Sequence, residues 1–208
     1  MARIDPRRLA AKFSLLAFMQ RVWQRADPFL VGRHTRAIAE RLDRAIHDFD
    51  QGRSTYLVIA VPFRHGKSDI ASRHLPPFFL GRHPESETIL ATYGDDLSHA
   101  MSRDARTIMR SPEYLDLFPR NALSPESHAA STWTLANGKG KFQACTIEAG
   151  ATGKGGHLLI VDDYLRGRTA AESAKIRDNQ WDNFTGNLMT RLAPVHIVLV
   201  IATPWHPD

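Results

Sequence analysis

Residues 56–68, YLVIAVPFRHGKS, are the stretch around which the rest of the sequence is organised. Their first half, Tyr56 to Val61, is a short apolar run with β-branched residues, which predicts a buried strand. Their second half turns at Pro62 and ends in Gly66-Lys67-Ser68, where we expect a helix to begin with Lys67 as an exposed charge. The stretch therefore predicts a strand, a tight turn and a helix in direct succession.

A strand followed by a Gly-Lys-Ser turn and a helix is an arrangement that binds phosphate. Backbone N–H groups of the turn and the positive end of the helix dipole both attract the anion. In such a loop Lys67 would reach the β- and γ-phosphates of ATP, and the Ser68 hydroxyl would bind Mg²⁺. The full pattern has a glycine five positions before Gly66, where this chain has Val61. A plain β-turn with a solvated lysine is the alternative interpretation.

The composition is that of one globular α/β domain, or of one domain with an extension. The chain has 208 residues, of which 43% are hydrophobic and 24% are charged. The single cysteine, Cys145, cannot form an internal disulfide and indicates a reducing compartment. No apolar run approaches the length that spans a bilayer, and the basic N-terminus lacks the apolar core of a signal peptide. We therefore expect a cytoplasmic protein without a membrane partner.

Positive charge is concentrated in residues 1–53, which hold 11 Lys and Arg against 6 Asp and Glu, whereas the remaining residues hold 16 of each kind. We expect residues 1–53 to be a basic helical segment packed on a core formed by residues 54–208. A basic segment on a neutral domain can meet nucleic acid. A solvated helical face is the alternative interpretation.

Two helices are predicted before the first strand. The first has one apolar face and is ended by Asp27-Pro28; the face consists of Leu9, Phe13, Leu16 and Trp23. The second is ended by Gly52, and its face consists of Ile38, Leu42, Ile46 and Phe49.

Apolar runs and helical faces then alternate along the chain. Strands are predicted at 88–93, 158–161 and 196–202, with a hairpin around Asn137-Gly138. One helix is predicted from about Ser68 until Pro76-Pro77 stops or kinks it. Others are predicted from a cap at Asp95 or Asp96 to Ser111-Pro112, and along the face of Ile176, Trp181, Phe184, Leu188 and Leu192. The glycine-rich segment 150–156 is expected to be a mobile loop.

Short apolar strands that alternate with helices predict an α/β fold, with a mainly parallel sheet covered by helices on both faces. In such sheets ligands bind outside the carboxyl ends of the strands. Three polar groups fall at such ends: Gly66-Lys67-Ser68, Asp162-Asp163 and Thr203. A strand that ends in an acid suits a Mg²⁺-nucleotide site, with Asp162 on the metal and the next acid orienting water. An Asx turn or a helix cap is the alternative for this acidic pair.

Several segments resemble the ATPase domain of the large terminase subunit, the DNA-packaging motor of tailed bacteriophages. VPFRHGKS resembles the family's variant Walker A motif, which often keeps an arginine, here Arg64, and lacks the first glycine. TGKGGHLLIVDDY resembles the Walker B motif and the loop before it, and ATYGDDLSHAMSRDARTIMRSPEYLDLFP resembles the stretch between the two motifs. The helix around Trp181 and Phe184 and the final IATPWH resemble the segment that leads into the coupling motif. The resemblance covers most of residues 28–206.

The resemblance implies an additional-strand P-loop NTPase that hydrolyses ATP to move double-stranded DNA into a procapsid. Arg64 would contact the γ-phosphate, and Thr203 would sense its loss. The expected nucleotide-binding residues are Pro62, Arg64, His65, Gly66, Lys67, Ser68 and Asp69. The implied partners are double-stranded DNA, a portal protein at the procapsid vertex, a small terminase subunit and further copies of the chain in a homo-oligomeric ring. The setting is the cytoplasm of a bacterial host, and we expect the isolated chain to be a monomer.

Three features depart from the family pattern. Asp163 stands where many relatives have glutamate, and Pro204 stands where relatives often have arginine. Terminases of this kind also continue into an RNase H-like nuclease domain, which this sequence lacks. We therefore expect a separate domain or a truncated gene product, without nuclease activity.

The catalytic acid and the arginine finger each have rival candidates. Asp163 is favoured as the acid that orients water. Glu172 is its rival, although Thr169-Ala170-Ala171-Glu172 also has the pattern of a capping box, with Glu172 at the third helical position. In the family an arginine of the neighbouring subunit completes the site, and Arg166 and Arg168 are the candidates here. Two ordinary charges in a solvated loop are the alternative.

Two other functions remain open. One is a helicase-like or other P-loop NTPase that acts on nucleic acid without packaging it. The other is a non-catalytic fragment that binds nucleotide, or only a partner.

Overall fold

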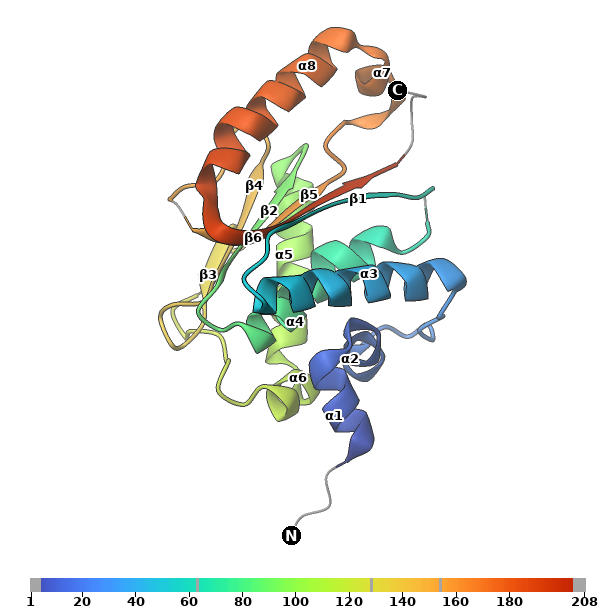
Figure 1. The fold of residues 1–208 in the computed structure, drawn as a ribbon, viewed down its shortest axis with the longest axis vertical. Helices are drawn as coiled ribbons and strands as arrows, with labels where there is room; N and C mark the ends of the chain where they lie inside the picture. The colour runs from blue at the N-terminus through green and yellow to red at the C-terminus, as the bar shows by residue number, and fades with distance from the viewer. Residues whose placement is uncertain (1–4, 63, 128, 154, 204–208) are drawn as a thin grey trace.

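A computed structural model describes residues 5–62, 64–127, 129–153 and 155–203 (Figure 1). Its centre is a six-stranded sheet with the order β1-β6-β5-β2-β4-β3. The strands are β1 (Thr55–Ala60), β2 (Glu87–Thr92), β3 (Thr132–Thr134), β4 (Lys141–Thr146), β5 (Gly156–Asp162) and β6 (Leu192–Ala202). Every pairing is parallel except that of β3 with β4. The predicted α/β fold with a mainly parallel sheet is therefore confirmed.

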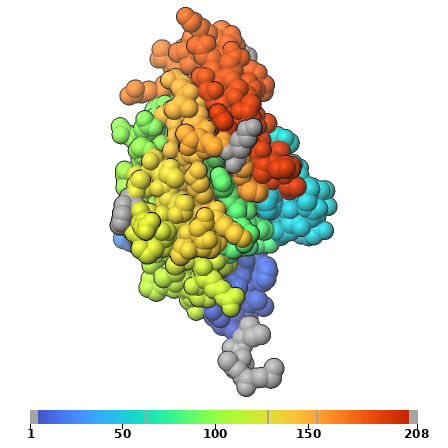
Figure 2. Space-filling model, turned by 90° about the vertical axis from the view of Figure 1, so that its left-hand side faces the viewer, coloured from blue at the N-terminus to red at the C-terminus, as the bar shows by residue number. Residues whose placement is uncertain are grey.

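Helices lie on both sides of this sheet. The α-helices are α1 (Pro6–Phe13), α2 (Leu15–Val22), α3 (Arg33–Asp50), α4 (Leu75–Arg82), α5 (Asp95–Arg110), α6 (Pro112–Leu117), α7 (Gly167–Glu172) and α8 (Ala174–Asn183). Two π-helical segments, η1 (Asp69–His74) and η2 (Phe184–Leu188), and the 3₁₀ turn η3 (Met189–Arg191) complete the set. On one side α3, α4 and α5 face the sheet and α1, α2 and α6 lie beyond them, whereas α8 lies on the other side (Figure 1). From the side of β3 and β4, α7 and α8 form a lobe at one end of the molecule (Figure 2). Among the described helices, none is both long and apolar enough to cross a membrane.

The first predicted helix is two helices, because Ser14 is extended and separates α1 from α2. The break changes the helical phase, so the predicted apolar face is wrong for Leu9 and Phe13, whereas Leu16 and Trp23 are partly buried. Leu9 and Phe13 are exposed, whereas Phe18 is fully buried and its ring lies 5.2 Å from that of Phe78 on α4. The face predicted for α3 is confirmed in its first three residues, Ile38, Leu42 and Ile46, which are buried; Phe49 is partly buried.

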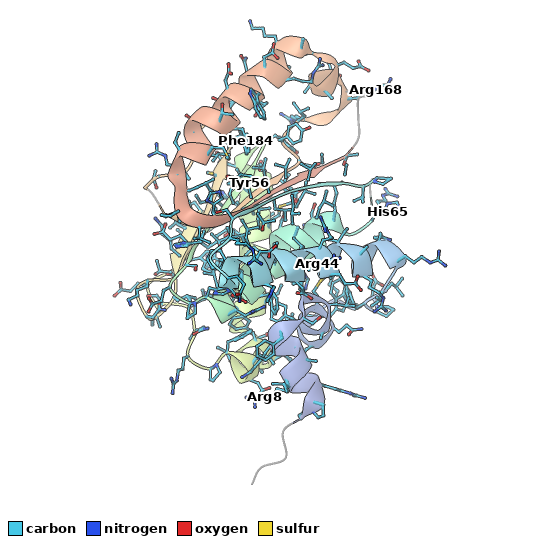
Figure 3. The ribbon with its side chains drawn as sticks, viewed as in Figure 1. Arg8, Arg44, Tyr56, His65, Arg168 and Phe184 are labelled. Atoms are coloured by element: carbon cyan, nitrogen blue, oxygen red, sulfur yellow. The ribbon has the colours of Figure 1, made fainter. Side chains whose placement is uncertain are left out.

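The strand β1 lies at the edge of the sheet, so the prediction of a buried strand is wrong. Its side chains alternate between half-buried and exposed, and Val58 is 75% exposed. Val58 lines a groove of about 450 Å³ on the α8 side of the sheet, together with Val200, Trp181 and Phe184. Figure 3 shows Tyr56 of β1 and Phe184 on this side. The second face of the sheet is therefore covered only in part.

The helix after the Gly66-Lys67-Ser68 turn is not stopped at Pro76-Pro77, but it changes there from π-helical to α-helical geometry. Its first part, η1, is π-helical, and the Leu75 N–H donates to the Ile70 carbonyl five residues back. The two prolines occupy the first positions of α4 directly after this wider turn. Prolines are tolerated at such positions because their missing N–H groups have no obligatory partner in a first turn.

Three other local predictions are corrected by the structure. Gly94, not Asp95 or Asp96, is the N-cap of α5, and both acids lie in the first turn. The capping box is wrong, because α7 begins at Gly167 and Glu172 is its last residue. No residue of α8 is buried, and the predicted helical face contacts the core only through Leu188 and partly buried neighbours. Leu192, predicted on the same face, is the first residue of β6 instead. The hairpin at Asn137-Gly138 is confirmed, with Gly138 at φ +73°.

Candidate functional site

The polar groups that follow β1, β6 and β5 meet at one end of the sheet, where these strands have their carboxyl ends. The three strands are adjacent and parallel, so their carboxyl ends lie side by side. Lys67 and Ser68 follow the loop after β1, Thr203 follows β6, and Asp162 is the last residue of β5. Ligands of open α/β sheets bind outside the carboxyl ends of the strands.

Lys67 is hydrogen-bonded to Thr203 at this end of the sheet. Its ammonium donates a hydrogen bond of 2.6 Å to the Thr203 hydroxyl. Only 7% of Lys67 is exposed, so the expectation of an exposed charge is wrong. The side chain is folded back over the end of β6, where the Thr203 hydroxyl gives it a polar partner.

Asp162 is fully buried and is held by a serine of the helix that follows the loop. The Ser72 hydroxyl donates to Asp162 Oδ2 at 2.6 Å, and Ser72 is also fully buried. Burial raises the pKa of Asp162; the Ser72 and Ser68 hydroxyls and the Lys67 charge offset part of this rise, and the Asp163 charge adds to it. Asp162 Oδ1 has no hydrogen-bond partner among the described residues.

The loops after β1 and β5 both contain residues with left-handed backbone. Arg64 and Asp163 are the non-glycine residues with positive φ in the described chain, at +60° and +47°, and Gly66 has φ +70°. Left-handed backbone is costly for residues with a side chain, and it concentrates at functional sites. The Asp163 carbonyl accepts from the Tyr93 N–H and its own N–H donates to the Ile201 carbonyl, which ties its backbone to both neighbouring strands.

Two of the expected nucleotide-binding residues have partners within the chain. The Asp69 carboxylate is held by Arg25, at 2.5 and 3.1 Å, and by Arg73, at 2.8 Å. The His65 ring lies 5.3 Å from the ring of His34 on α3. Pro62 and Arg64 lie in the loop itself, and Arg64 is exposed. The loop is thus supported from the N-terminal segment on its outer side.

The rival acid and the candidate finger arginines lie on a different element. Glu172 accepts from Arg168 Nε at 2.7 Å within α7, and both side chains are at least half exposed. Arg166 is the N-cap residue of α7 and lines a pocket with Tyr93 and Asp95 at the carboxyl end of β2. Figure 3 shows Arg168 at the far end of the molecule from α3.

The residues at the carboxyl ends of β1, β6 and β5 fit a magnesium ion that is bound together with a nucleotide. Asp162 Oδ1 is a buried oxygen with no described partner, and Ser68 opens the helix beside it. In the described part of the chain, no group of three His, Cys, Asp or Glu could hold a metal ion. Mg²⁺ in nucleotide sites needs no such group, because one or two protein ligands, phosphates and water complete its shell.

Sequence reasoning missed Ser72 and Arg25. Ser72 stands four residues after Ser68, a spacing that places two hydroxyls on one helical face, and this was an available signal. Arg25 lies in an irregular segment between α2 and α3, and nothing in the sequence connects it with Asp69. Residues 204–208, which include Pro204 and the end of the expected coupling motif, lie outside the described residues.

Comparison with known proteins finds similarity among solved structures. No protein-family model and no curated protein matches the chain. Among solved structures, the crystal structure of the HK97 bacteriophage large terminase is similar, with a TM-score of 0.53. The fold is terminase-like. The terminase-like region covers 92% of this chain and 37% of the HK97 chain, at 15% sequence identity. At this identity the similarity shows the fold alone.

Proposed function

We propose that this chain is an ATPase of the additional-strand P-loop type, whose ATP hydrolysis moves double-stranded DNA into a viral procapsid. One observation carries the proposal: Lys67, Thr203 and Asp162 lie at the adjacent carboxyl ends of β1, β6 and β5, within a terminase-like fold. The position of β6 between the strand before the phosphate loop and the strand that ends in Asp162 supports the additional-strand type.

The side chains have distinct roles in this proposal. Lys67 and the loop N–H groups bind the phosphates and neutralise charge that grows on the transferred phosphoryl group. Asp162 and Ser68 would hold Mg²⁺, which supplies further neutralisation of the phosphates when bound. Asp163 orients the attacking water, and Arg64, exposed in the loop, contacts the γ-phosphate.

Thr203 has the coupling role. Its hydroxyl accepts from Lys67, and it directly follows β6. Movement of Lys67 toward or away from a phosphate therefore changes a contact at the end of β6. This contact is the route by which we expect loss of the γ-phosphate to reach the DNA-binding parts.

The partners follow from the terminase-like fold. The working state is a homo-oligomeric ring at the portal vertex of a procapsid in a bacterial cytoplasm, with a small terminase subunit that selects the DNA. The chain spans 37% of the HK97 large terminase, so these properties of a whole packaging motor are proposed for the assembly and not for the isolated chain. The isolated chain is proposed to be a monomer.

ATP turnover with and without DNA tests this function. Turnover that rises with double-stranded DNA and not with single-stranded DNA supports a packaging motor. Stimulation by single-stranded DNA alone would instead support a helicase-like NTPase. Nucleotide binding without turnover under any condition would leave a non-catalytic nucleotide-binding fragment.

A further inference from the structure

The exposed side of α3 carries a group of arginines. Arg33, Arg36, Arg41 and Arg44 are all exposed on this helix. In the described part of the chain none of the four forms an ion pair with a carboxylate; Arg44 donates to the Glu40 backbone carbonyl at 3.3 Å. Figure 3 places Arg44 on α3 and His65 near the other end of that helix.

Other arginines of the basic N-terminal segment are neutralised within the chain. Arg8 and Arg21 both pair with Asp116, and Arg25 pairs with Asp69. Arg53 pairs with Asp48 at the end of α3. Among the described arginines of residues 5–53, those that form no ion pair with a carboxylate are therefore Arg7 on α1 and the four on α3.

The acids of α3 are mostly turned away from the arginines. Asp43 accepts the Leu15 N–H on the α2 side, and Asp50 pairs with Arg82 and His83. Glu40 is exposed among the arginines, and Asp48, which pairs with Arg53, lies on the same side of the helix.

The helical geometry aligns these charges. At 100° per residue, Arg33, Arg36 and Arg44 lie within about 80° of one another around the axis, over a length of about 17 Å. Glu40 falls within this sector. Three exposed guanidinium groups outnumber this single carboxylate, and such a positive surface attracts the phosphate backbone of a duplex without regard to base sequence.

We propose that this exposed face of α3 binds the phosphate backbone of double-stranded DNA. The inference rests on the proposed function, to which it adds the surface that contacts the DNA. Because α3 begins beside the phosphate loop, where His34 meets His65 at 5.3 Å, this surface is also connected to the nucleotide site.

Salt-dependent binding of the 208-residue chain to a short DNA duplex tests the proposal. In the triple variant Arg33→Gln, Arg36→Gln, Arg44→Gln the slope of log affinity against log salt should flatten by roughly 2 to 3, because each lost phosphate contact removes about 0.9. Glu40→Gln removes a negative charge from the same face, so it should tighten DNA binding. The matched control removes three exposed arginines elsewhere, Arg103, Arg110 and Arg120, and should keep the wild-type slope.

The outcomes separate this inference from the proposed function. A triple variant that binds like wild type, or a control that loses as much as the triple variant, would overturn the α3 surface while leaving DNA binding intact. A wild-type chain that does not bind duplex DNA would overturn both.

A second inference comes from the independent contact between Ser72 and Asp162. Both side chains are fully buried, and the hydroxyl donates to one carboxylate oxygen, Oδ2, at 2.6 Å. The other oxygen, Oδ1, has no partner among the described residues. The contact thus fixes the carboxylate orientation and leaves a single defined oxygen available.

We infer that Ser72 is a positioning residue, which orients Asp162 so that Oδ1 serves as the metal-binding oxygen. Ser72 lies on the π-helical segment η1, in the same helix as the phosphate loop's Ser68. Residues that orient a metal ligand typically change metal affinity roughly 10–100-fold when they are removed. This inference also rests on the proposed nucleotide site.

Thermal shifts by ATP, with and without Mg²⁺, test the role of Ser72. Ser72→Ala should keep the shift by ATP alone but raise the Mg²⁺ concentration for half of the additional shift by roughly 10–100-fold. The matched control is Ser102→Ala, which removes another fully buried hydroxyl, the acceptor of the Trp133 indole N–H at 3.0 Å. It should lower the melting temperature without changing the Mg²⁺ dependence.

An unchanged Mg²⁺ midpoint in Ser72→Ala would reduce Ser72 to a structural residue and overturn the inference. A wild-type chain with no shift by ATP in any condition would instead count against the proposed function itself. If Ser72→Ala does not fold, Ser72→Cys is used instead, and Mn²⁺ is titrated directly into its ATP complex. An Mn²⁺ affinity equal to that of the wild-type chain would overturn the role of the Ser72 hydroxyl.

Discussion

Lys67 and Thr203 are joined by a hydrogen bond of 2.6 Å, although 136 residues separate them in the chain. The bond closes the space between the loop after β1 and the end of β6. A nucleotide phosphate bound in the loop would compete with the Thr203 hydroxyl for the same ammonium. The pair is therefore placed to report whether the loop is occupied.

Lys67→Ala should abolish ATP hydrolysis in a protein that remains folded. In the proposed function the lysine neutralises charge that develops in the transition state, and loss of one such group typically costs about 10²–10³ in rate. Because Lys67 is buried and bonded to Thr203, its loss should also lower the melting temperature. A hydrogen bond is worth about 1 kcal/mol, which corresponds to roughly 2–4 °C for a chain of this size. Turnover by phosphate release and folding by circular dichroism are the measurements. Full activity in the folded variant would rule out the phosphate-loop assignment.

Thr203→Val should lower turnover, or its stimulation by DNA, more than it lowers ATP affinity. Valine keeps the shape of threonine but removes the acceptor of Lys67. Thr203→Ser retains the hydroxyl and is the matched control. Equal behaviour of the valine and serine variants in a steady-state assay with DNA would show that the bond is not used.

Asp163→Asn should abolish turnover and spare nucleotide binding, whereas Glu172→Gln should spare turnover. Asparagine tolerates the positive φ of residue 163, so this variant changes the charge without adding backbone strain. Glu172 is paired with Arg168 on an exposed helix, and its loss should cost no more than about 0.5 kcal/mol. The assays are phosphate release and fluorescent-nucleotide binding. The opposite pattern would assign the catalytic role to Glu172.

Asp162→Asn should raise the melting temperature at pH 7 while it removes the Mg²⁺-dependent activity. Burial raises the pKa of Asp162 above 3.8, so ionisation is harder in the folded than in the unfolded state. Stability therefore falls as pH rises from 3.8 through the raised pKa, and the full cost is present at neutral pH. Asparagine has no such cost, so its advantage should shrink as pH falls toward 4. Calorimetry of both proteins from pH 4 to pH 8 checks the sign; a variant that is less stable than wild type at pH 7 would contradict it.

Specific turnover should rise more than proportionally with protein concentration, or on DNA that gathers subunits. A trans arginine finger is worth 10³–10⁵ in rate in other NTPases. Arg168 is held by Glu172 within the chain, whereas Arg166 lies beside the pocket at the end of β2, so each is tested alone. A Lys67→Ala subunit should rescue an arginine variant when the two are mixed. Turnover that is independent of concentration, without rescue, would mean that one chain completes its own site.

The sequence predicts the parts of the fold that depend on local pattern. The strand, turn and helix around Gly66, the strand that ends in Asp162 and the apolar strand before Thr203 are all present, and their common sheet edge follows from parallel pairing. Apolar runs of this kind are long enough to define a strand and its polar end. The arrangement of candidate residues at the carboxyl ends of these strands was therefore predictable.

The remaining features depend on tertiary neighbours that a local pattern does not contain. The run around Val58 has the composition of a buried strand, but β1 has a neighbour on one side only. The phase change at Ser14 and the π-helical turn before Pro76 each arise where backbone hydrogen bonds are rearranged locally. The ion pair of Arg25 with Asp69 joins residues 44 apart and has no periodic signal.

The free edge of β1 has a practical consequence for work with this protein. Residues 55–60, TYLVIA, carry no charge and no proline, which are two of the devices by which natural edge strands avoid pairing with other molecules. Concentrated samples should therefore associate edge to edge and lose solubility long before the chain unfolds. A single lysine in place of the exposed Val58 should keep such samples clear, so shelf life, and not melting temperature, is the property that this strand controls.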